Sequence, residues 1–206
     1  KSRGDRVGGI VFNQHSHAEL KPRSRKEGVL HYLHALTAIH LSQHQSQYKN
    51  NVSADSNPQN ESINGHYFSD NCARIRQIAK PGSLVYLITD AQQIKAVNSQ
   101  QQQDALRHLT QISQHCELVV CLVDDPLEQA LPISSVKLNV TLTDGDNRQQ
   151  LTLGDNNTAT QYQKNARIIN EQCSKLLTKA GARVINFSAG QTLEQQLKDG
   201  AQFCSK

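Results

Sequence analysis

The chain has 206 residues, a net charge of +4, an aromatic content of 4% and no tryptophan. That length fits one domain over residues 1–206, with a core built mainly from Leu, Ile, Val and Ala. So small a charge with so few aromatic rings argues against a nucleic-acid surface, which needs a broad basic stripe and rings for base stacking. No apolar run reaches the roughly 20 residues of a membrane span, and no signal peptide is recognisable.

The five cysteines show neither metal-binding nor redox spacing. None falls in a CxxC pair, and most lie in apolar patterns that are typical of small buried side chains. An odd number of cysteines favours a reducing compartment over a disulfide framework. The expected location is therefore cytoplasmic, or the cytoplasmic side of a membrane-anchored protein. The chain opens at Lys1 without methionine and looks cut from something longer, so any anchor would lie in a segment absent from this sequence.

The first part of the chain predicts two strands and two helices. Residues 6–12 and 17–20 are the expected strands, and residues 25–47 the first helix. The inner face of that helix is expected to carry an apolar stripe at helical spacing, formed by Val29, Leu33 and Leu36. Residues 49–66, rich in Asn, Ser and Asp, predict a loop or a disordered insertion.

The second helix is expected over residues 69–79, with Ser69 or Asp70 as its cap. Apolar runs then predict buried strands at 84–88 and 118–124. A long helix over 92–113, which contains the glutamine run 100–103, connects them.

The last part of the chain predicts a β-hairpin and an α/β unit. The hairpin covers residues 136–153, around turn residues at 144–147. The clearest helix runs from Tyr162 to Ala180, and Gly181 is expected to end it in the left-handed conformation. A strand and a final helix follow, at residues 183–187 and 192–204.

Strands and helices alternate along the chain, which predicts an α/β fold. The sheet is expected to be doubly wound, mostly parallel and Rossmann-like, with helices on both faces and the hairpin as an addition. The carboxyl ends of the strands form the functional edge of such sheets. Asp90, Asp124 and Asp125 follow two expected strands, so a metal or partner site at that edge is the first hypothesis.

Four groups of residues occur in an order that resembles a known family. They are Gly4-Asp5-Arg6-Val7-Gly8, Pro22-Arg23, Pro81-Gly82-Ser83-Leu84-Val85 with Thr89-Asp90, and Asp125-Pro126-Leu127-Glu128 with Leu131-Pro132. This order resembles the bacterial domain-of-unknown-function family fifty-eight over nearly the whole chain. Its members carry a domain similar to von Willebrand factor A and are commonly encoded beside MoxR-type AAA+ ATPases.

The resemblance implies a divalent-cation site that this sequence carries only in part. Such domains bind Mg²⁺ with oxygen ligands from an Asp-x-Ser-x-Ser loop after the first, central strand, from a threonine, and from an aspartate that Asp90 matches. The sequence has no Asp-x-Ser-x-Ser, and Ser24 is only a weak stand-in for the threonine. The metal motif is thus incomplete: Mg²⁺ at Asp90 is expected in an intact protein, and no cofactor in this chain.

The strand that carries this loop in the family is also absent from the sequence. It would be the middle of the sheet. The resemblance therefore implies a sheet that is disturbed or refilled, or one completed by a segment of a partner.

The acidic candidates have structural readings as well. Asp90 could cap the helix that follows it, and Asp124, Asp125 and Glu128 could form only a strand end and a turn fixed by Pro126. Together with Asp90 they could instead form a carboxylate cluster for metal-dependent hydrolysis.

Two further patterns have weaker readings. His40 and His44 stand four apart on a helix, a spacing that can bind zinc but also occurs in ordinary half-buried histidines. Ser188-Ala189-Gly190 stands before a helix whose N-terminus could accept an anion.

The function favoured by the sequence is non-enzymatic. The resemblance implies a protein-interaction module that works with a MoxR-type AAA+ ATPase in the assembly or maturation of other proteins. Asp90, Asp125 and Glu128 are the candidate partner-binding residues. The alternatives are a metal-dependent hydrolase that uses strand-end carboxylates and a structural domain of a membrane-anchored protein.

Overall fold

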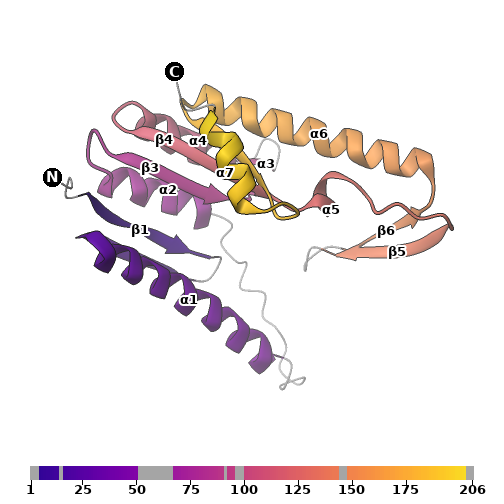
Figure 1. Ribbon diagram of the computed structural model, residues 1–206, viewed down its shortest axis with the longest axis horizontal. Helices are drawn as coiled ribbons and strands as arrows, with labels where there is room; N and C mark the ends of the chain where they lie inside the picture. The colour runs from indigo at the N-terminus through magenta and orange to yellow at the C-terminus, as the bar shows by residue number, and fades with distance from the viewer. Residues whose placement is uncertain are drawn as a thin grey trace.

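A three-stranded parallel sheet forms the centre of the protein (Figure 1). The computed structural model describes residues 5–13, 16–50, 67–90, 92–95, 100–143 and 148–202. The strands are β3 (Leu84–Thr89), β4 (Glu117–Asp124) and β7 (Arg183–Ser188), in the order β3-β4-β7. The predicted α/β class with a parallel sheet is confirmed, and the arrangement is compatible with a Rossmann-like fold.

The middle strand, β4, is apolar along most of its length because both of its faces are covered. Its residues Leu118–Leu122 are all buried, as expected for a parallel strand between two layers. Parallel registers place Tyr86 of β3 opposite Val119 and Val184 of β7 opposite Val120. Successive side chains of a strand point to opposite faces, so Leu118, Val120 and Leu122 share one face of the sheet.

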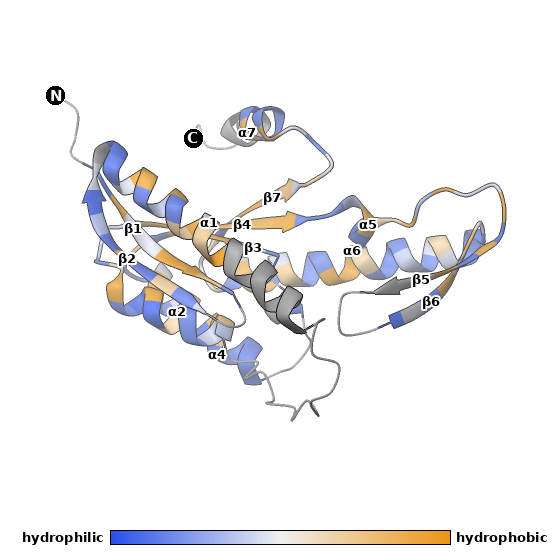
Figure 2. Ribbon diagram, turned by 90° about the horizontal axis from the view of Figure 1, so that it is seen from below, coloured by the Kyte–Doolittle hydropathy of each residue, from blue (hydrophilic) through white to orange (hydrophobic). Residues whose placement is uncertain are grey.

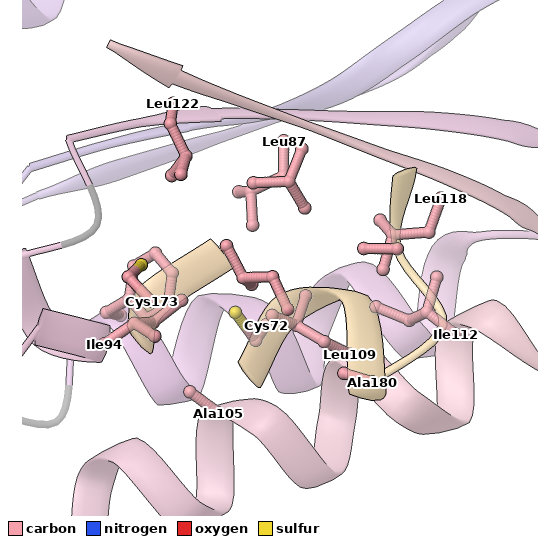
Figure 3. Packing of buried hydrophobic residues seen from close by; sticks show 14 of the residues in the cluster. Cys72, Leu87, Ile94, Ala105, Leu109, Ile112, Leu118, Leu122, Cys173 and Ala180 are labelled. Atoms are coloured by element: carbon pink, nitrogen blue, oxygen red, sulfur yellow. The ribbon is translucent and has the colours of Figure 1, made fainter. Parts of the chain in front are cut away.

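That face holds the main core (Figure 3). Three helices cover it: α2 (Tyr67–Ile78), α4 (Gln100–Ser113) and α6 (Asn156–Lys179). Cys72, Leu109 and Leu177 supply one buried side chain each from these helices. The last helix, α7 (Leu193–Gln202), lies on the opposite side of the sheet near β7 (Figure 2).

The long helix expected over 92–113 is wrong, because the structure has two helices there. They are α3 (Gln92–Lys95) and α4, and residues 96–99 between them lie outside the described residues. The buried side chain of Gln102 donates a hydrogen bond of 2.6 Å from Nε2 to the carbonyl oxygen of Ile94. Residues eight apart in one helix are separated by about 12 Å along its axis. This bond therefore requires the two helices to be separate.

Helix α6 ends in a Schellman motif, as the glycine after it predicted. Gly181 has a φ of +86°. Its N–H donates to the carbonyl of Thr178 at 2.9 Å, and the N–H of Ala182 donates to that of Leu177 at 3.1 Å. This pair of bonds satisfies two carbonyls at the helix end. The prediction that Gly181 closes the helix in the left-handed conformation is confirmed.

Replacing Gly181 by alanine is expected to lower the free energy of unfolding by about 2 kcal/mol. A side chain in left-handed backbone costs about 1 kcal/mol. The new Cβ would also lie 2.9 Å from Cβ of Ser113, whose hydroxyl donates to the carbonyl of Ala180 at 2.7 Å. The matched control is Gly82, which has a φ of +79° and no atom within 4 Å of the position that a Cβ would take.

Urea unfolding of the Gly181→Ala and Gly82→Ala variants measures the difference. Gly82→Ala should lose only the backbone part, about 1 kcal/mol. Equal losses in the two variants would show that the contact with Ser113 costs nothing.

The N-terminal strands form a separate antiparallel sheet. Strand β1 (Arg6–Phe12) pairs with β2 (His17–Ser24), and α1 (Arg25–Asn50) packs against both. The ring of Phe12 lies 6.3 Å from that of Phe68 in α2, centroid to centroid. The hairpin is thus attached to the core through side chains, while no strand ladder joins β1 to β3 in the described part of the chain.

The inner face predicted for α1 is wrong by about one residue. The expected stripe, Val29, Leu33 and Leu36, is between 42 and 51% exposed. The helix instead packs on the hairpin through Gly28, where a Cβ would lie 2.6 Å from the carbonyl oxygen of Arg23, and through Tyr32, whose ring would lie 3.2 Å from a Cβ at Gly9. Such close approach favours glycine. Successive residues of a helix point in directions about 100° apart. Because the packed face is displaced by one residue from the predicted one, the stripe of Val29, Leu33 and Leu36 is left uncovered.

Two boundary predictions are corrected in the same region. Helix α2 begins at Tyr67, so Ser69 and Asp70 lie in its first turn and are not its cap. Helix α1 continues to Asn50, so the expected loop over 49–66 begins later than predicted. Residues 51–66 lie outside the described residues.

The segment after β4 contains a second small sheet. Strands β5 (Leu138–Thr143) and β6 (Arg148–Leu153) pair antiparallel, and β6 contacts α6. Residues 144–147, expected to be the turn, are not described. None of the helices in the described ranges has the length and apolarity to cross a membrane.

Candidate functional site

The predicted acidic residues leave the sheet at a common edge. Thr89 of β3 lies opposite Leu122 of β4. Asp90 directly follows β3 and Asp124 is the last residue of β4, so both lie at the carboxyl ends of neighbouring parallel strands. Helix α5 (Pro126–Gln129) begins directly after this edge. The Nζ atom of Lys95 in α3 lies 3.5 Å from Oε2 of Glu128 in α5, which joins the two segments. We call the surface formed by Asp90, Asp125, Leu127 and Glu128 the carboxyl rim.

Asp90 and Asp125 both accept a hydrogen bond from the backbone at the start of a helix. Oδ1 of Asp90 accepts from the N–H of Gln92 at 3.3 Å, and Oδ1 of Asp125 accepts from that of Leu127 at 2.8 Å. These bonds satisfy donors that a helix start leaves without intrahelical partners. Both side chains are exposed, so each keeps oxygen atoms that a partner could contact.

Asp124 is half-buried and is held from two sides. Its Oδ2 accepts from Nε2 of Gln129 at 2.6 Å, and its carbonyl oxygen accepts from the N–H of Ala189 after β7 at 2.8 Å. Its Oδ1 is buried and has no hydrogen-bond partner. Asp124 thus fixes the path of the chain between β4 and α5.

Tyr162 supports the rim from α6. Its hydroxyl donates to the carbonyl oxygen of Leu127 at 2.8 Å. Burial raises the pKa of this hydroxyl, and the nearby charge of Glu128 raises it further. The hydroxyl therefore stays protonated as a donor. Sequence reasoning missed this contact, because helical periodicity assigns Tyr162 only to the inner stripe of its helix.

The residues that the structure describes at the carboxyl rim do not fit a Mg²⁺ ion. Magnesium requires near-octahedral oxygen coordination, whereas no three His, Cys, Asp or Glu side chains gather at one point among the residues that the structure describes. Asp90 binds a backbone N–H, and Ser24 lies at the end of β2 in the separate N-terminal sheet. No chemical step through a metal follows from this arrangement.

The turn after β7 is occupied by a glutamine side chain. The N–H of Ser188 donates to Oε1 of Gln196 at 2.7 Å, and Nε2 of Gln196 donates to the carbonyl oxygen of Ser188 at 2.9 Å. The anion site considered for Ser188-Ala189-Gly190 would have to displace this side chain. The side chains of His40 and His44, the possible zinc pair, lie outside the described residues.

The cysteines in the described ranges are small core residues, as the sequence predicted. Cys72, Cys116, Cys121 and Cys173 are free and buried. Burial raises the pKa of the Cys72 thiol to about 12 and also raises the pKa values of Cys121 and Cys173. A thiol acts as a nucleophile through its thiolate, and the raised pKa values keep these three cysteines in the thiol form at neutral pH.

No family model, curated protein or solved structure matches this chain. The family expected from the sequence therefore enters below as a proposal, and the rim has to be interpreted from its own geometry.

Proposed function

We propose that the chain is a non-enzymatic protein-interaction module that docks its partner on the carboxyl rim. The observation that carries this proposal is the exposed position of Leu127 between Asp125 and Glu128 on α5. An apolar side chain bordered by carboxylates is suited to a protein surface that presents an apolar group next to basic residues. Asp90 extends the acidic border onto the neighbouring strand.

The resemblance of the sequence supports a MoxR-type AAA+ ATPase as the partner. We propose accordingly that the parallel sheet belongs to a von Willebrand factor A-like domain, and that the pair acts in the assembly or maturation of other proteins. The short loops that carry the rim are anchored to the sheet through Asp124 and to α6 through Tyr162. Such anchoring keeps a docking surface preorganised, which lowers the entropy lost on binding.

Reversing one charge on the rim is expected to weaken this interaction. Glu128→Lys should lower the affinity for a purified MoxR-type AAA+ ATPase roughly tenfold or more, because it places a cation where the partner presents one. Biolayer interferometry with the immobilised chain, at two salt concentrations, measures the affinity. The salt dependence should shrink in the variant, since exposed charges are screened by salt.

Glu194→Lys is the matched control. Glu194 is an exposed glutamate on α7 that pairs with Lys198 at 2.7 Å, as Glu128 pairs with Lys95. Its reversal removes the same charge and an ion pair from a residue that is not part of the carboxyl rim. An equal loss of affinity in both variants, or an unchanged affinity in both, would contradict docking on the rim.

A further inference from the structure

The turn that follows β7, residues 188–191, is held from two sides. The side-chain amide of Gln196 in α7 accepts from the N–H of Ser188 at 2.7 Å, and it donates to the carbonyl oxygens of Ser188 and Gln191 at 2.9 and 3.1 Å. On the side of the sheet, the N–H of Ala189 donates to the carbonyl oxygen of Asp124 in β4 at 2.8 Å. A side-chain amide can pair with backbone groups as another peptide unit would. The backbone of this turn is therefore fixed to both α7 and β4.

Gly190 lies in this turn directly against the first residue of α5. A Cβ at Gly190 would lie 2.5 Å from Cγ of Pro126 and 3.5 Å from its Cδ. The first of these distances is too short for any side chain to replace the hydrogen of Gly190 without a shift of its neighbour. Because the ring of proline is closed on its own backbone, Cγ cannot rotate away as the end of a flexible side chain would. The contact between Gly190 and Pro126 thus leaves no room for a larger residue.

The position of Pro126 decides where the rest of α5 lies. Pro126 is the first residue of this four-residue helix, after the N-cap Asp125, a position that its fixed φ favours. Leu127 follows at once, and its N–H donates to Oδ1 of Asp125 while its carbonyl oxygen accepts from Tyr162, both at 2.8 Å. So short a helix has no further turn that could absorb a displacement of Pro126. A shift there would move Leu127 and Glu128 with it.

We propose that Gly190 and Gln196 are positioning residues of the carboxyl rim. Gln196 fixes the turn after β7, and Gly190 in that turn fixes α5 through Pro126. The effect on a partner rests on the proposed function, whereas the position of α5 does not. A docking surface that is held in place before binding loses less entropy when its partner binds. Helix α7 is thereby coupled to the rim, although it contributes no residue to it, and Ser188-Ala189-Gly190 has a role that needs no anion.

Nuclear magnetic resonance of the ¹⁵N-labelled chain tests the position of α5. Gly190→Ala should shift the amide signal of Leu127, because a displaced Pro126 alters the hydrogen bond from this N–H to Asp125. The amide signal of Val120, buried in the middle of β4, should keep its position, which would show that the sheet is intact. A Leu127 signal that does not move would overturn the proposal.

A second substitution separates displacement of α5 from a general loss of stability. Pro126→Ala removes Cγ and Cδ and keeps only Cβ, which lies 3.7 Å from the position of the new Cβ at residue 190. In the double variant Gly190→Ala/Pro126→Ala, the Leu127 signal should therefore return to its position in Pro126→Ala alone. Independent substitutions have additive effects. Shifts that simply add in the double variant would overturn the proposal.

Gln196→Ala tests the other end of this connection. It removes the three hydrogen bonds between the Gln196 side chain and the turn, so the Leu127 signal should shift here as well. Gln191→Ala, which alters an exposed side chain of the same turn, is the control and should leave that signal in place. An unshifted signal in Gln196→Ala, or equal shifts in both variants, would overturn the role of Gln196.

Affinity for the purified MoxR-type AAA+ ATPase completes the test. Gly190→Ala should lower it about fivefold, and the double variant should recover the affinity of Pro126→Ala, because α5 again lies in its docking position. A shifted Leu127 signal with unchanged affinity would overturn the effect of these residues on partner binding. If the unmodified chain binds no ATPase, the proposed function fails, while the Leu127 signal still decides whether Gly190 and Gln196 position the rim.

Discussion

Replacing Phe68 by alanine is expected to lower the free energy of unfolding by about 4 kcal/mol. Phe68 is buried in the core cluster, and its ring is the one that Phe12 of the hairpin approaches at 6.3 Å. The substitution removes a large apolar side chain and also one of the aromatic contacts between the hairpin and α2. Urea unfolding measures the loss, and amide exchange should rise first in β1 and β2.

A double-mutant cycle separates the two effects of this substitution. Phe12→Ala should be coupled to Phe68→Ala by about 0.5–1.5 kcal/mol, the usual value for an aromatic pair. Tyr67, whose ring lies 6.5 Å from that of Phe12, supplies the comparison pair through Tyr67→Ala. A coupling close to zero for both pairs would show that the hairpin is not held by its aromatic side chains.

Replacing Leu177 by alanine is expected to lower the free energy of unfolding by about 3 kcal/mol. Leu177 is 0% exposed and fixes α6 in the cluster that also contains Leu109 and Val120. The alanine would leave a cavity that surrounding helices and strands can fill only in part. Such a loss is a large share of the roughly 5–15 kcal/mol that stabilises most domains. Chemical denaturation with a two-state fit provides the measurement.

Leu193→Ala on α7 is the matched control for Leu177→Ala. Leu193 is 60% exposed, so its truncation removes the same atoms with little change in buried area, and the expected loss is about 0.5 kcal/mol or less. If the two variants lost the same free energy, α6 would not pack on the sheet through Leu177.

Local sequence patterns were sufficient to predict the central α/β unit. The apolar run that ends at Asp124 and the stop at Gly181 each depend on neighbours in the sequence, and both are found as predicted. The shared edge of Asp90 and Asp124 also followed from the sequence, because adjacent parallel strands end at the same side of a sheet.

The wrong predictions from the sequence concern features that depend on tertiary contacts. The packed face of α1 is set by glycines at positions 9 and 28, which allow close approach, whereas apolar spacing alone favoured the neighbouring stripe. The break before α4 is accompanied by the bond between Gln102 and Ile94, which no helical periodicity reveals. Likewise, the contact of Tyr162 with Leu127 joins residues 35 positions apart, so only the folded chain shows that α6 supports the rim.

The four consecutive glutamines at the start of α4 are not equivalent to one another. Gln102 is buried against Ile94, while Gln100 and Gln103 are exposed. Inserting or deleting one glutamine would leave a glutamine two positions before Asp104 and would change only the length of chain between this glutamine and Ile94. Because any glutamine of the tract can take the buried position, a change in its length would alter the connection between α3 and α4 while the hydrogen-bonding side chain stayed the same.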